Sequence, residues 1–207
     1  MKLFVVLAMA LLPGAAYFIA GSEPDVIFSD PLKGKLADGW EWLRQNNKTW
    51  RHSSNGLEIR VEPGLAPTVK NALLRKAPDR SQGKHAIEVT IEFLSSPTQQ
   101  YEQAGITWYQ GTKPAFKLVH EFINGKTYII PGKRPTDTRL MQLRLIVSRD
   151  QYIAQFRPDA KGEFQTALSG KLAPGEDERV SIQCYNGPPA AEHWIRFSDF
   201  KILRFSE

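Results

Sequence analysis

Apolar and polar residues alternate with a period of two along most of the chain. The clearest example is residues 86–93, where Ile87, Val89 and Ile91 point to one side and the polar residues between them to the other. This alternation is typical of a half-buried β-strand. The same pattern predicts further strands over residues 57–61, 104–109, 116–122, 127–130, 140–148, 152–157, 180–185 and 194–205.

Turn residues separate these segments at intervals of roughly ten residues, a spacing that favours an all-β sandwich or barrel. Examples are Asn124-Gly125, Pro131-Gly132 and Asn186-Gly187. After residue 22 no window sustains the 3.6-residue apolar stripe of a helix, although residues 68–76 could hold one helical turn. Without repeats, linkers or a break in composition, residues 23–207 are predicted to form a single domain.

The N-terminus has the three parts of a secretory signal peptide. Lys2 precedes ten apolar residues, Leu3 to Leu12, and Pro13-Gly14 then breaks the run before small residues. The alternative is an uncleaved membrane anchor, because the uncharged run through Ser22 is just long enough to span a bilayer. The proline and the missing charged flank favour cleavage. Residues 1–22 are therefore predicted to be a signal peptide, and the mature protein to be secreted or periplasmic, with membrane contact only through an uncleaved leader.

The positive charge of the chain does not indicate a nucleic-acid partner. Lys and Arg number 27 and Asp and Glu 22, which gives a formal net charge of +5. The basic residues are scattered, and the densest stretch, residues 70–84, is interrupted by Asp79 and a proline. A nucleic-acid-binding domain would show a basic stripe or patch.

The one cysteine, Cys184, excludes a disulfide framework and a Cys-rich zinc site. It lies in an alternating strand, where it is predicted to be a small buried hydrophobic residue. The four histidines show no paired spacing typical of metal ligands, so we predict no metal site and no cofactor.

An ordered set of short motifs carries a family resemblance. It begins with Trp40-Glu41-Trp42, continues with Trp50 and then Gly56-Leu57-Glu58-Ile59, and ends with Phe197-Ser198-Asp199-Phe200. Over residues 26–207 the set resembles the concanavalin A-like jelly-roll domain at the C-terminus of β-xylosidase-type glycosidases. It resembles still more the stand-alone relatives of that domain, whose function is unassigned.

The resemblance implies a two-sheet antiparallel jelly-roll sandwich. Trp40, Trp42 and Trp50 alternate with polar residues, a spacing at which large aromatic side chains usually anchor the core of a sandwich. It leaves the activity open, because the superfamily includes lectins, glucanases and inert accessory domains. A structural Ca²⁺ would follow from the resemblance alone, since the chain has no loop rich in Asp and Asn.

Catalytic carboxylates are not evident. Glucanases of this fold place them on alternate residues of one strand, and the chain has no Glu-x-Asp-x-Glu strand. Glu88 and Glu92 share a strand face but lie ~13 Å apart by strand rise, so both are expected to be exposed on a solvent face. An enzyme would need a pair assembled across strands, such as Glu121 with Glu88 or Glu92.

Binding is the better supported chemistry, because sugars stack on aromatic rings and bond to polar groups at the rim. On the predicted strand 116–122, Lys117 and Glu121 share one face and would flank a groove beside Tyr109 if they project from the concave sheet. Polar residues of later strands, such as Gln142 and Arg144, are expected to form the same kind of polar face. The candidate ligand-binding residues are Trp108, Tyr109, Lys117, Glu121 and Trp194.

The sequence therefore favours an exported, monomeric carbohydrate-binding or interaction module whose partner is a polysaccharide or another glycan. Two alternatives remain: a glycoside hydrolase or lyase of the same fold, and a purely structural domain that docks on a partner. A carboxylate pair in a cleft would indicate the enzyme, and an exposed apolar patch would indicate the docking domain.

Overall fold

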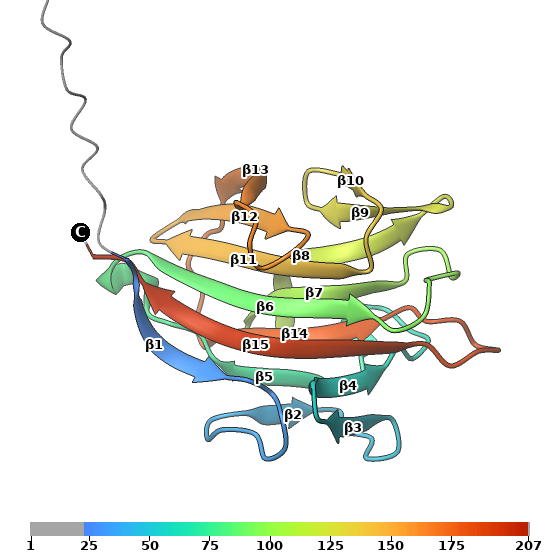
Figure 1. Cartoon of the computed structure of the whole chain (residues 1–207). Helices are drawn as coiled ribbons and strands as arrows, with labels where there is room; N and C mark the ends of the chain where they lie inside the picture. Colours follow the sequence, from blue (N-terminus) through green and yellow to red (C-terminus); the bar gives the residue numbers. More distant parts are fainter. Residues whose placement is uncertain (1–22, 207) are drawn as a thin grey trace, which may run out of the picture.

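Two antiparallel β-sheets pack face to face in a computed structural model that describes residues 23–206 (Figure 1). The larger sheet has eight strands. In spatial order they are β13 (Gln165–Lys171), β12 (Gln151–Arg157), β11 (Leu140–Ser148), β6 (His85–Phe93), β15 (Trp194–Arg204), β4 (Gly56–Arg60) and β3 (Trp50–Ser53). The eighth, β1 (Asp25–Asp30), also pairs with β15.

The smaller sheet has seven strands. They follow the order β10 (Arg134–Thr136), β9 (Lys126–Ile130), β8 (Lys113–Ile123), β7 (Gln103–Gln110), β14 (Glu178–Tyr185), β5 (Ala72–Lys76) and β2 (Glu41–Leu43). Neighbours in the sheets are often distant in sequence, as where β14 lies between β7 and β5 (Figure 1). Two short 3₁₀ helices lie in the connections between strands: η1 (Ala66–Thr68) between β4 and β5, and η2 (Arg80–Gln82) between β5 and β6.

The core lies between the sheets and follows from the alternation of each strand. Ile87, Val89 and Ile91 of β6 are fully buried there, as is Ile106 of β7 in the facing sheet. Burying these side chains removes apolar surface from water, at roughly 25 cal/mol per Å², and holds the two sheets together. The three tryptophans at positions 40, 42 and 50 pack against the core while partly exposed, as expected for aromatic anchors.

The predicted strands are confirmed, with ends that shift by up to three residues. Residues 68–76 form no α-helical turn. Instead η1 ends at Thr68 and the strand β5 begins at Ala72. Six further strands were not predicted, namely β1, β2, β3, β5, β10 and β13. Four of the six have five residues or fewer, which leaves little room for an alternating pattern, and β13 is mostly exposed on both faces.

The predicted signal peptide, residues 1–22, lies outside the described residues. In residues 23–206, no helix is long enough and apolar enough to cross a membrane.

Candidate functional site

A groove of about 520 Å³ hollows the outer face of the seven-stranded sheet, the face that points away from the core. Residues of β7, β8 and the end of β14 line it, together with η1 and the residue before it. We call it the outer groove. Its lining residues are Leu65, Ala66, Pro67, Tyr101, Gln103, Thr107, Pro114, Ala115, Phe116, Lys117, Glu121, Tyr185 and Asn186.

Three polar side chains form one bonded network in the outer groove. The ammonium of Lys117 lies 3.1 Å from Oε2 of Glu121 and donates to Oε1 of Gln103 at 2.7 Å. The amide of Gln103 in turn donates to Oε1 of Glu121 at 3.1 Å. The register between β7 and β8 places Gln103 directly opposite Glu121, which explains this contact. The carboxylate is nearly buried, at 7% side-chain exposure, whereas Lys117 is 35% exposed.

Tyr101 stands at the rim of the outer groove with 51% of its surface exposed. Its backbone is left-handed, with φ of 66°, a conformation that bulky residues rarely adopt. Two bonds hold it there: its N–H donates to the carbonyl of Phe122 at 2.8 Å, and its carbonyl accepts from Gln103. Backbone strain of this kind is concentrated at functional sites. Leu65, at 64% exposure, is a second exposed apolar side chain of the same groove.

Two buried tyrosines, Tyr109 beneath the outer groove and Tyr185 in its wall, are protonated at neutral pH. Tyr109 and Tyr185 belong to a small apolar cluster with Val69, Ala72 and Leu74 on the outer face of the sheet. Burial raises the pKa of both hydroxyls, so each stays neutral at neutral pH. The Tyr109 hydroxyl donates to Oε1 of Gln183 at 2.9 Å.

Thr107 supplies an unsatisfied polar group to the same site. Its hydroxyl is buried and has no hydrogen-bond partner among the described residues, although the side chain lines the outer groove. Unpaired buried polar groups are uncommon, because each costs about 1–3 kcal/mol. Thr107 therefore places an unpaired hydrogen-bonding group in the wall of the outer groove.

Of the five predicted ligand-binding residues, Lys117 and Glu121 come together and line the outer groove. Tyr109 projects from the same face but has no exposed surface, because Val69 and its neighbours pack over it. Tyr109 thus supports the groove from below.

Trp108 and Trp194, the other two predicted ligand-binding residues, lie away from the outer groove. Trp108 faces the opposite way from Tyr109 on β7 and is fully buried in the core, where no ligand reaches it. Trp194 begins β15 in the other sheet, and the guanidinium of Arg51 covers its ring at 4.3 Å. The strand alternation that places Ile195 in the core puts Trp194 on the outer face of the eight-stranded sheet.

The suggested carboxylate pairs do not form. Glu121 lies on the outer face of the seven-stranded sheet, whereas Glu88 and Glu92 are on β6 of the eight-stranded sheet, and the core separates them. Glu88 is also buried rather than exposed, because Arg144 forms an ion pair over it. Glu92 pairs with Arg196 at 2.7 Å.

The polar face of β11 is likewise on the other sheet. Gln142 and Arg144 project from the outer face of the eight-stranded sheet, where Gln142 accepts a hydrogen bond from Arg157 at 2.6 Å and Arg144 pairs with Glu88. These side chains bond to one another and do not extend the outer groove. Residues 23–206 hold no group of three His, Cys, Asp or Glu side chains arranged to bind a metal.

Sequence reasoning missed Tyr101, Thr107 and Tyr185 as groove residues. Alternation could have found two of them: Thr107 shares a strand face with Tyr109, and Tyr185 follows the buried Cys184. Tyr101 lies in a turn before β7 and has no periodic signal.

Solved structures with the same fold include carbohydrate-active proteins. The GH43 BlXynB protein from Bacillus licheniformis matches with a TM-score of 0.70 and 16% identity over 86% of this chain and 39% of that one. A xylan β-1,4-xylosidase from Bacillus halodurans matches with a TM-score of 0.60 and 13% identity over 86% and 39%. A functionally unknown protein from Saccharomyces cerevisiae matches with a TM-score of 0.54 and 14% identity over 82% and 98%.

These likenesses show that the chain has a concanavalin A-like jelly-roll sandwich fold. It spans about 39% of the length of both bacterial proteins. No protein-family model matches the chain, and no curated protein matches it in sequence.

Proposed function

We propose that this protein is an exported carbohydrate-binding or interaction module that binds a glycan in the outer groove without covalent chemistry. The observation that carries the proposal is the exposed ring of Tyr101, held in a strained backbone conformation beside the bonded network of Lys117, Gln103 and Glu121. An aromatic face next to polar groups is the arrangement that suits a sugar ring.

The charge of the outer groove favours a neutral saccharide. Lys117 and Glu121 are its charged lining residues, and they neutralise each other at 3.1 Å. Free hydrogen-bonding capacity remains at the hydroxyl of Thr107 and at the third N–H of Lys117. A ligand with several hydroxyl groups can use both.

Catalysis by a carboxylate pair finds no support in this groove. Glu121 is the one acidic residue of its described lining, and both of its oxygens are engaged by Lys117 and Gln103. Glycosidases of either stereochemistry need a second carboxyl group within about 5–10 Å.

A glycan array probed with the purified protein, followed by calorimetric titration of each hit, tests the proposal. We expect Tyr101→Ala to weaken binding about tenfold, the effect of losing one aromatic contact of about 1.5 kcal/mol. Leu168→Ala is the control, because Leu168 is an exposed apolar residue of β13 in the other sheet. If no glycan binds at millimolar concentration, or if both variants bind as the parent does, the outer groove is not the binding site.

A further inference from the structure

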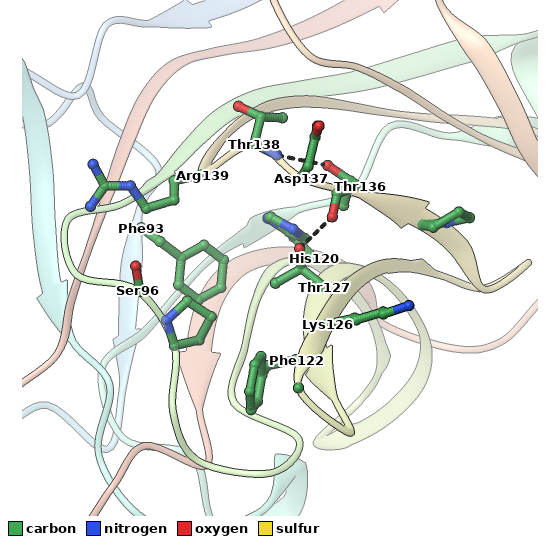
Figure 2. Close-up of a pocket in the computed structure, with 13 residues that line it drawn as sticks. Phe93, Ser96, His120, Phe122, Lys126, Thr127, Thr136, Asp137, Thr138 and Arg139 are labelled. Atoms are coloured by element: carbon green, nitrogen blue, oxygen red, sulfur yellow. Dashed lines mark hydrogen bonds between the residues drawn. The ribbon is translucent and has the colours of Figure 1, made fainter.

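A second and larger pocket, of about 800 Å³, opens at one end of the sandwich (Figure 2). The end of β6, the strands β8 and β9, and the segment that joins β10 to β11 contribute its walls. We call it the end pocket. The lining residues on which the argument depends are Phe93, His120, Phe122, Lys126, Asp137 and Arg139.

His120 closes the inner end of this pocket. Its side chain is fully buried, and neither ring nitrogen has a hydrogen-bond partner among the described residues. The imidazole packs edge-on against Phe93 of the facing sheet, with ring centroids 5.0 Å apart and an interplanar angle of 88°. A buried imidazole with both nitrogens unpaired is destabilising unless something bonds to it.

The protonation state of His120 indicates which group suits it. Burial lowers the pKa of His120 to about 4, so at neutral pH the ring is uncharged, with one N–H donor and one acceptor nitrogen. A hydroxyl group also donates one hydrogen bond and accepts others. The ring therefore complements a hydroxyl better than it complements a carboxylate or an ammonium group.

The remaining walls are amphipathic. Phe93 and Phe122 supply apolar ring surface, whereas Lys126, Asp137 and Arg139 are exposed side chains near the mouth (Figure 2). None of these three charged residues forms an ion pair with another described residue. Arg139 donates one hydrogen bond to the carbonyl of Leu94 at 3.3 Å. Because both signs of charge are present, these residues favour no strongly charged ligand, and Lys126, Asp137 and the remaining N–H groups of Arg139 can bond to hydroxyls.

We infer that the end pocket binds the terminal unit of a saccharide, with one sugar hydroxyl bonded to His120 and a C–H face of the ring against Phe122. The pocket ends at the fully buried His120, which suits the last unit of a chain. This site is separate from the outer groove: His120 and its neighbour Glu121 project to opposite faces of β8. The choice of a saccharide rests on the proposed function, whereas the existence of the pocket does not.

Imidazole ¹H–¹⁵N spectra of the ¹⁵N-labelled protein test the inference, because the chain has four histidines and His120→Phe assigns the signal of His120. The probes are the methyl glycosides of xylose, glucose and galactose, and phenol as a ring with a single hydroxyl. We expect at least one glycoside to shift the His120 signal saturably. The signal of His52, which is exposed on β3, should not move.

Surface variants that preserve the core complete the test. Asp137→Ala and Lys126→Ala should each raise about fivefold the glycoside concentration that gives half of the maximal His120 shift. This is the loss of affinity expected for one hydrogen bond. Tyr101→Ala should leave that shift unchanged while it weakens glycan binding in the outer groove, so the two sites can fail separately. No shift of His120 with any glycoside overturns the inference, whatever the groove binds. A shift produced by phenol alone overturns the assignment to a saccharide.

Discussion

Lys117 and Glu121 are in contact although they lie four residues apart on one extended strand. The strand rise between them is ~13 Å, and their side chains reach along the outer face until Nζ and Oε2 are 3.1 Å apart. Gln103 of the neighbouring strand bonds to both of them. The three side chains thus form one bonded network between β7 and β8. Within it, the side chain of Glu121 is nearly buried and that of Lys117 is partly exposed.

Because Glu121 is nearly buried and Lys117 is not, removing one charge should lower the free energy of unfolding by a different amount from removing the other. Lys117→Met leaves the nearly buried carboxylate of Glu121 with Gln103 as its one partner, and should lower the free energy of unfolding by about 2 kcal/mol. Glu121→Gln should cost about 1 kcal/mol or less, because the half-exposed Lys117 can turn toward water. Urea denaturation measures both values, with Lys113→Met at the exposed start of β8 as the control. A larger loss for Glu121→Gln would contradict this account.

Gly105 is predicted to be intolerant of any side chain. A Cβ atom there would lie 2.3 Å from the carbonyl oxygen of Leu118 and 2.8 Å from the Cα of Val119. Both are backbone atoms of the paired strand β8, so the steric clash can be removed only if β7 and β8 move apart. Gly105→Ala should therefore lower the free energy of unfolding by ~3 kcal/mol or more and weaken binding in the outer groove.

Gly162→Ala is the matched control for Gly105. A Cβ at Gly162 would meet its nearest atom, Oδ1 of Asp159, at an ordinary contact distance of 3.5 Å. The change in stability should stay within about 0.5 kcal/mol. Equal effects of the two substitutions, measured by urea denaturation, would mean that the close approach of β7 to β8 is not the cause.

The alternation of polar and apolar residues was enough to predict which face of a strand each side chain takes. On β8 it correctly separated Lys117 and Glu121 from the inward-facing His120. Alternation does not determine which sheet a strand joins, because that depends on pairing between segments distant in sequence. For this reason Gln142 and Arg144 were grouped with the polar residues of β8, although β11 belongs to the other sheet.

The site residues that sequence reasoning misplaced depend on contacts of long range. Trp108 and Tyr109 are adjacent, so they face opposite sides of β7, and Tyr109 is covered by a segment about forty residues earlier. Nothing local in the sequence distinguishes a covered tyrosine from an exposed one. Tyr101 is exposed because a turn holds it in a left-handed conformation, and turns carry no periodic signal.

The single cysteine should be unreactive in the folded protein. Cys184 is buried in β14, with its sulfur 3.7 Å from the carbonyl oxygens of Ile59 and Arg60. Burial raises the pKa of its thiol, and the nearby carboxylates of Glu102 and Glu62 raise it further. Only the thiolate reacts, and only an opened structure exposes it.

An aromatic disulfide reagent followed by absorbance measures this reactivity. We expect labelling in native buffer to be ~10³-fold slower than in denaturing urea, which also serves as the control for reagent and thiol content. Complete labelling of the native protein within the mixing time would show that β14 is not stably buried.

Because burial lowers the pKa of His120, we expect the protein to lose stability as the pH falls below about 6.5. Above that pH, His120 is neutral in both the folded and the unfolded chain and contributes no pH dependence. Between about 6.5 and about 4 the unfolded chain binds a proton that the folded protein does not, because burial lowers the folded-state pKa to about 4. Lowering the pKa of His120 from 6.5 to about 4 corresponds to about 3 kcal/mol of stability, which is lost progressively toward acid pH.

His120→Phe isolates this contribution because it keeps an aromatic ring against Phe93 while it removes both unpaired nitrogens. Near pH 7 the variant should be more stable than the parent by about 1 kcal/mol, and this advantage should grow toward pH 4. The pKa of His85, also lowered by burial, affects parent and variant alike and cancels in the difference. Urea denaturation of both proteins across this range gives the measurement. Parallel stability curves would show that the acid sensitivity arises elsewhere, since only a group that titrates differently in the two proteins can change the slope.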